Sequence, residues 1–178
     1  MGISVFLSYP TPHLQAQQQF IAHVEGYLLS QGLEARTMGK SNYDMDAPLA
    51  GIRRLMVGCC GLLSVAFRRS LAKKVQVRAG ADLDKVFSEE VEHIWLTSPY
   101  CQIEPAMAYQ LGIPILIMKE RGVMAEGVLE KGVTGQYLPE FDCSQDVFGI
   151  AEWTNILNQW VGRVRSVYDN RGRPPQLL

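Results

Sequence analysis

The pattern of apolar and polar positions divides the 178-residue chain into short apolar runs separated by longer amphipathic stretches. Short unbroken apolar runs, bounded by turn residues, are typical of strands buried on both faces. Three such runs and two weaker segments are predicted to be strands: 3–9, 34–37, 60–67, 113–118 and 135–141.

Helical spacing of apolar residues predicts helices between these strands. The helices predicted in this way cover about 13–33, 47–58, 82–96 and 145–168. Gly32 fits the position after the end of the first helix. The second helix is expected to have Asp46 as its cap and Pro48 in its first turn.

Strands that alternate with helices indicate a parallel sheet covered by helices on both faces. The chain is long enough for one such domain, assigned to 1–170, and 171–178 is expected to be a flexible tail. Sheets of this kind bind ligands beyond the carboxyl ends of their strands. The candidate site residues that follow the first and third strands are Ser8, Tyr9, Phe67, Arg68 and Arg69.

A single carboxylate, Glu104, lies in the largely apolar segment "TSPYCQIEPAMAYQLGIPILIM" (97–118). The segment predicts a helix that starts either at Ser98 and Pro99, or at Pro105 with Glu104 as its cap. The helix dipole favours a negative charge at either place, so a structural role explains the carboxylate. The functional alternative is a carboxylate that faces a cleft and stabilises, or attacks, an oxocarbenium ion as a glycosidic bond breaks.

The same segment and the first strand resemble two related families. The stretch "VFLSY" (5–9) resembles the opening strand of TIR domains, and a Glu followed by small residues and "LGIPILI" (111–117) resembles nucleoside 2-deoxyribosyltransferases. The resemblance covers most of 3–142. It implies a flavodoxin-like α/β three-layer sandwich with a central, mostly parallel five-stranded sheet. It also implies cleavage of an N-glycosidic bond, which in TIR-type enzymes is the nicotinamide–ribose bond of NAD.

Transferred by position, the resemblance implies that Glu104 is the catalytic residue. An NAD pocket would also need donors for the pyrophosphate. Arg68 and Arg69, just past a strand end, could supply them, and Arg68 is expected to meet phosphate; the alternative is that both only solvate a surface segment. The residues implied to line the substrate pocket are Ser8, Tyr9, Ser98 and Tyr100. NAD would be the substrate, and neither a cofactor nor a metal is expected. The product would be ADP-ribose or a cyclic ADP-ribose-type signal, which bacterial TIR-like proteins often use in antiviral defence.

Two departures from these families bear on the choice of activity. The segment 70–97 lengthens the connection between the third strand and Glu104, and "TSPYCQI" lacks the Asp that deoxyribosyltransferases carry before their glutamate. The missing Asp weakens the deoxyribosyltransferase reading more than the TIR-like one. Two alternatives stay open: a deoxyribosyltransferase-like N-glycosidase or transferase, and a non-catalytic module that senses a nucleotide or assembles with partners.

Composition narrows the partners. A net charge of −1 gives no electrostatic reason for binding nucleic acid or a membrane surface, and the longest apolar run, 55–67, is too short to span a bilayer. Four cysteines without zinc-type spacing predict reduced thiols in a cytoplasmic protein. The partners implied by the resemblance are a nucleotide and an effector protein that responds to the product. Trp153 and Trp160 could pack either against a second copy or in the core.

Overall fold

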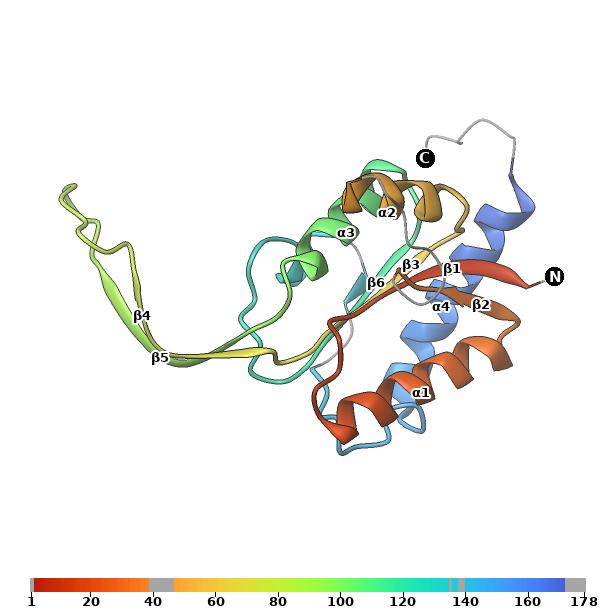
Figure 1. Cartoon of the computed structure of the whole chain (residues 1–178), viewed down its shortest axis with the longest axis horizontal. Coiled ribbons are helices and arrows are strands. Elements are labelled where there is room, and N and C mark those ends of the chain that lie inside the picture. Colours follow the sequence, from red (N-terminus) through yellow and green to blue (C-terminus); the bar gives the residue numbers. More distant parts are fainter. Residues whose placement is uncertain (1, 39–46, 135, 138–139, 172–178) are drawn as a thin grey trace.

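A five-stranded sheet forms the centre of the computed structural model, in the order β2-β1-β3-β6-β7, and every neighbouring pair is parallel (Figure 1). The residues described are 2–38, 47–134, 136–137 and 140–171. The strands of this sheet are β1 (Ile3–Ser8), β2 (Leu33–Arg36), β3 (Leu62–Ala66), β6 (Ile115–Lys119) and β7 (Gln136–Tyr137). The predicted flavodoxin-like α/β sandwich is confirmed.

Helices cover both faces of the sheet (Figure 1). They are α1 (Gln15–Ser30), α2 (Pro48–Val57), α3 (Tyr100–Gln110) and α4 (Ala151–Asp169), with a short 3₁₀ turn, η1 (Gly127–Leu129). Gly32 follows α1 with a positive φ of 73°, as the predicted helix end requires. The expected cap Asp46 and residues 172–178 of the predicted tail lie outside the described residues. Among the described helices, none combines the length and apolarity needed to cross a membrane.

Alternate residues of the central strands face opposite layers of the sandwich. Val5 and Leu7 of β1 belong to the core cluster formed with α1 and α4. Phe6, between them, belongs to the cluster formed with α2 and α3. Leu62 and Leu63 of β3 divide between the two clusters in the same way. The strands read as continuous apolar runs because helices cover both of their faces.

The last helix is fixed to the sheet by its tryptophans. Trp153 and Trp160 are 3% and 0% exposed, so the alternative in which they pack against a second copy is wrong. The indole Nε1 of Trp160 donates a hydrogen bond of 3.2 Å to the carbonyl oxygen of Pro114. Gly61 allows this close approach, because a Cβ there would lie 2.6 Å from a methyl group of Val164.

The predicted helix at 82–96 is wrong. The chain instead forms an antiparallel hairpin of β4 (Ser70–Val77) and β5 (Glu89–Leu96), which is a sheet of its own. Helical spacing of apolar residues arose by chance here, because one part of the pattern lies in the exposed turn and the other in β5. The strand β4 supplies the pairing partner, and backbone pairing overrides the apparent helical face.

Replacing Trp160 with Ala removes a fully buried indole and its hydrogen bond, so we expect the free energy of unfolding to fall by about 3–5 kcal/mol. Urea unfolding followed by circular dichroism measures the change. The matched control is Leu29→Ala in α1, where an exposed side chain should change the free energy by less than about 0.5 kcal/mol. Equal effects of the two substitutions would show that α4 is not held by Trp160.

Candidate functional site

The order of the strands reverses between β1 and β3, and in open parallel sheets ligands bind at such a reversal. Ser8, the last residue of β1, pairs with Ser64 of β3 at this point. Both serines face α2 and α3, because Ser8 lies two residues beyond Phe6 and Ser64 two residues beyond Leu62. Both hydroxyl groups are buried, and neither is matched to a backbone partner in the described part of the chain. Two buried hydroxyl groups at a reversal of strand order, one of them beside the Glu104 carboxyl, indicate a polar site.

Helix α3 brings Glu104 over these serines. The helix begins at Tyr100, after Pro99, and the Ser98 hydroxyl oxygen accepts a hydrogen bond of 3.3 Å from the Tyr100 backbone N–H. The start at Ser98 and Pro99 is confirmed, and the alternative in which Glu104 caps a helix starting at Pro105 is wrong. Glu104 lies within α3, one turn after its start, and its side chain faces the sheet. The residue is only 6% exposed.

Burial raises the pKa of the Glu104 carboxyl, and the Ser8 hydroxyl beside it acts in the opposite direction. The sequence predicted that the helix dipole would keep this carboxyl ionised, but loss of contact with water is the larger effect. The Glu104 side chain makes no ion pair with a described residue that would explain its burial. A buried carboxyl with a perturbed pKa in a cleft is a candidate for chemistry.

A hollow of about 370 Å³ opens over Glu104. It lies between the end of β1, the segment after β2, the start of α2, the residue before β4 and the start of α3. Its lining residues are Tyr9, Pro10, Thr11, Met38, Pro48, Ile52, Arg69, Ser98, Tyr100 and Glu104. Of the four residues predicted to bind substrate here, Tyr9, Ser98 and Tyr100 line the hollow. Ser8 does not, and it is buried beside the Glu104 carboxyl instead.

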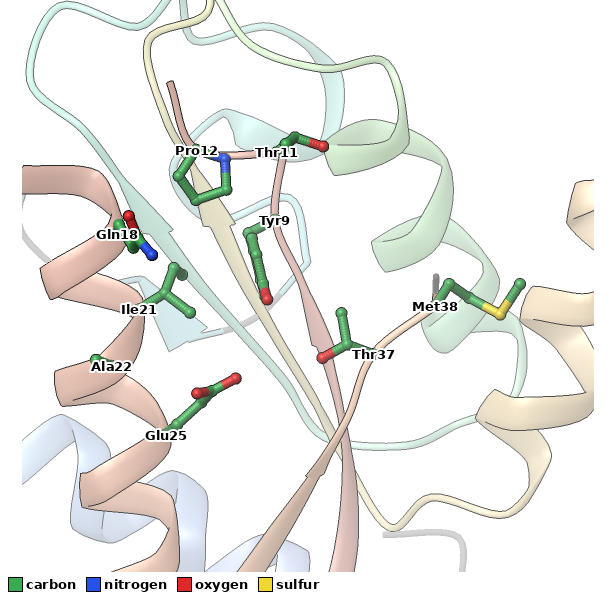
Figure 2. Close-up of a pocket in the computed structure, with 9 residues that line it drawn as sticks. All are labelled: Tyr9, Thr11, Pro12, Gln18, Ile21, Ala22, Glu25, Thr37 and Met38. Carbon is green, nitrogen blue, oxygen red and sulfur yellow. The ribbon is translucent and has the colours of Figure 1, made fainter. Parts of the chain in front are cut away.

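A second hollow, of about 560 Å³, adjoins the first around the end of β1. The two hollows share Tyr9, Thr11 and Met38. Figure 2 shows the Tyr9 ring between α1, which contributes Ile21 and Glu25, and the segment after β2. The hollow over Glu104 lies on the α2–α3 side of β1, and this second hollow lies on the α1 side. Together they form a divided groove along the carboxyl edge of the sheet.

Arg68 and Arg69 occupy different environments. The Arg68 Nε donates a hydrogen bond of 2.6 Å to the Arg121 carbonyl oxygen, and its guanidinium lies over the Trp95 ring. The Arg68 backbone N–H donates to the Glu120 carboxylate at 2.7 Å. Arg68 is therefore held at the base of the hairpin and does not line either hollow. Arg69, the next residue, lines the hollow over Glu104 and is exposed.

Other candidates for chemistry have structural roles. Phe67 is buried in the core against the Phe20 ring, so it is not a site residue. Cys101 lies close to Glu104, but burial raises the pKa of its thiol to about 11, which keeps the thiol neutral. Among the described residues, no group of histidine, cysteine, aspartate and glutamate side chains is arranged to hold a metal ion.

Several lining residues had not been identified from the sequence. Thr11 stands between Pro10 and Pro12, and a strand that ends at a proline-rich loop was a detectable signal. Met38 and Ile52 carried no signal, because an apolar residue after a short strand or inside a helix reads as core. Ile52 reaches the hollow because α2 packs beside β1, and Met38 reaches it from the segment after β2.

Comparisons with known proteins bear on the fold. No protein-family model matches the chain, and no curated protein matches it. The chain is similar to a CMP N-glycosidase from Clostridium botulinum at 13% identity and a TM-score of 0.50, over 88% of this chain and 98% of that one. This likeness shows a shared fold.

Two further solved structures are similar at lower scores. The TIR domains of the activated Roq1 resistosome match at 10% identity and a TM-score of 0.43, over 96% of this chain and 86% of that one. A conserved protein from Enterococcus faecalis V583 matches at 9% identity and a TM-score of 0.43, over 95% of this chain and 99% of that one.

Replacing Glu104 with Gln should stabilise the protein at neutral pH. Because folding raises the pKa of this carboxyl, the native state holds the proton more tightly, and stability falls as pH rises through the folded pKa. Urea unfolding at a series of pH values should show the Gln variant more stable near pH 7. The difference should disappear below about pH 4, where the carboxyl is protonated in both states.

Glu130→Gln, at an exposed position, is the matched control and should not change stability with pH in this way. A Glu104→Gln variant that is less stable than the wild type at neutral pH would show that the carboxylate is favourably paired in the folded protein.

Proposed function

We propose that the protein cleaves the N-glycosidic bond between nicotinamide and ribose in NAD. The observation that carries the proposal is a single buried carboxyl, Glu104, in the wall of a hollow at the reversal of strand order. Oxygen atoms of a carboxylate in this position stabilise the positive charge that develops on the ribose as the base departs. The resemblance of "VFLSY" to TIR domains supports the same substrate.

The chemistry of the leaving group favours NAD over an ordinary nucleoside. The nicotinamide ring of NAD is a cation, so when the C1′–N bond breaks, the electron pair returns to the ring and nicotinamide leaves as a neutral molecule. No proton donor is needed for that step. Among the described residues that line the hollow, Glu104 carries the only carboxyl group, and this set suits a leaving group that needs no general acid. Water, or a second nucleophile, then adds to C1′.

The shape of the groove supports a substrate with two halves. The hollow over Glu104 would hold the nicotinamide riboside half, and the adjoining hollow on the α1 side would hold the adenosine half. Tyr9 lies between the two and offers an aromatic face for stacking. Arg69 takes the phosphate-binding role expected of Arg68, because its side chain lines the hollow while that of Arg68 is occupied elsewhere.

Product and biological role follow the sequence resemblance. If the adenine ring of the same substrate attacks C1′, the product is a cyclic ADP-ribose-type signal, and if water attacks, the product is ADP-ribose. Either would suit a role in bacterial antiviral defence. The Clostridium botulinum protein with the shared fold is a CMP N-glycosidase. Cytidine monophosphate is therefore the second substrate to test, and a single hollow of about 370 Å³ would have to hold it.

Glu104→Gln should lower the rate of nicotinamide release by about 10²–10³-fold, because the amide cannot neutralise charge at C1′. Chromatography of NAD incubated with each protein measures nicotinamide, ADP-ribose and any cyclic product. Binding of NAD, measured by calorimetry, should persist, since the Gln side chain has nearly the same shape. Glu130→Gln is the matched control and should retain full activity.

The same assay separates the alternatives. Release of cytosine from cytidine monophosphate without release of nicotinamide from NAD would show that cytidine monophosphate, and not NAD, is the substrate. Full activity of the Glu104→Gln variant on NAD would remove Glu104 from the mechanism.

Arg69→Gln should raise the KM for NAD by about tenfold to a hundredfold, because a charge-assisted hydrogen bond to phosphate is lost. The KM for nicotinamide riboside, which has the same scissile bond and no phosphate, should not change. Steady-state kinetics on both substrates measures the difference. Lys73→Gln, an exposed cation on β4, is the control. Equal changes for the two substrates would show that Arg69 does not recognise phosphate.

A further inference from the structure

The β4–β5 hairpin is an arm that projects from the body of the protein (Figure 1). Its two ends are joined by a hydrogen bond of 2.9 Å from the Arg69 backbone N–H to the Leu96 carbonyl oxygen. Beyond Trp95, which bridges to Val123, the arm runs free of the central sheet. A strand of eight residues extends for about 26 Å, so the turn of the arm lies far from the candidate site.

One face of the arm carries two apolar cross-strand pairs, with the charged Lys73 between them along β4. Val75 lies opposite Val91, and Leu71 lies opposite Trp95. Residues two apart point to the same side of a strand, so these pairs share a face. The exposed turn continues this character with Leu83 at 71% and Phe87 at 76% exposure, and with Val86 between them in sequence.

Such an arm has little reason to be stable by itself. A lone two-stranded hairpin is marginal in water, and large apolar side chains gathered at an exposed tip mark a surface that binds something. The Nζ of Lys74 lies 2.7 Å from a carboxylate oxygen of Glu90 across the arm. Both side chains are exposed, and exposed ion pairs contribute little to the free energy of unfolding. Burial of the apolar tip against a partner would supply the missing stabilisation.

An apolar groove lies on the outer surface of α2 and α3. Its volume is about 570 Å³. It is lined by Arg53, Ile103, Ala106, Met107, Gln110 and Leu111. Four of these six side chains are apolar, and the charged one, Arg53, comes from α2. In the described part of the chain, the arm does not cover this groove, because the arm extends away from α2 and α3 (Figure 1).

We propose that the arm tip of one chain docks in the α2–α3 groove of a second copy. The chain carries both halves of the contact: an exposed apolar tip, and an apolar groove large enough to receive side chains from it. Charge favours the same pairing, since the tip segment 82–87 carries Asp82, Asp84 and Lys85, a net charge of −1, and Arg53 lies at the groove. This proposal does not depend on the activity proposed above.

The expected assembly is a two-fold symmetric dimer in which each copy gives its arm and receives the other. A symmetric exchange uses the same contact twice, so it closes at two copies and leaves neither tip exposed. Charge disfavours pairing between arms along like edges, because β4 carries Lys73 and Lys74 while β5 carries Glu89, Glu90 and Glu92. Two β4 edges, or two β5 edges, would bring like charges together.

Sedimentation velocity of the full chain tests the exchange. The wild type should sediment at about twice the 19.9 kDa of one chain. Phe87→Ser in the tip and Ala106→Glu in the groove should each give monomers, because one removes the apolar anchor and the other places a bulky anion against the acidic tip. Both positions are exposed, so the fold should survive. Leu29→Ser, at an exposed apolar position in α1, is the control and should remain dimeric.

Mixing the two variants gives the sharper result. The arm of the Ala106→Glu chain and the groove of the Phe87→Ser chain are both intact, so an equal mixture should form dimers where neither variant does alone. A wild type that stays monomeric would overturn the proposal. So would a Phe87→Ser or Ala106→Glu variant that remains dimeric, or a mixture that stays monomeric at concentrations where the wild type is fully dimeric.

Discussion

Parallel pairing of β1 with β3 is the constraint on which the rest of the structure depends. The register that joins Ser8 to Ser64 also decides which side chains face each layer of helices. A slip of β1 by one residue would turn Ser8 toward α1 and α4 and bring Leu7 under α3, while Ser64 would keep its place. With the observed register, two buried hydroxyls and the Glu104 carboxyl meet at one point of the sheet edge. The polar site and the apolar core are therefore set by the same backbone hydrogen bonds.

Much of the fold could be predicted from short-range patterns. The three apolar runs and the helices α1 and α2 were identified within a few residues, because both faces of each central strand and one face of each helix must be buried. The helix α4 was identified as well, but it begins at Ala151, six residues after its predicted start at 145. The sequence placed Glu104 near the start of a helix but left two starts open, and the structure selects the one at Ser98 and Pro99. The sequence could not show that the Glu104 carboxyl is buried or that its pKa is raised, because burial depends on how closely α3 packs on β1 and β3.

The failures share a physical cause. Helical periodicity in 82–96 is a local signal, but the alternative depends on pairing with β4, twelve or more residues earlier. A glycine with φ of 72° at position 80 marked the turn, but a single glycine does not decide between the two patterns. The sequence also did not show which of two neighbouring arginines faces the hollow. Adjacent residues at a strand end point to opposite sides, so only one of Arg68 and Arg69 can do so, and it is Arg69.

The way the arm joins the body has a consequence for how such a chain can change over generations. Its first and last backbone positions stand a single hydrogen bond apart, so the body meets the arm at one narrow junction. Lengthening, shortening or exchanging the ribbon would leave the parallel sheet and its packed helices undisturbed. The choice of partner and the chemistry of the site can then change separately. This holds even though β4 begins next to Arg69, which lines the hollow, and β5 ends shortly before α3, which carries Glu104.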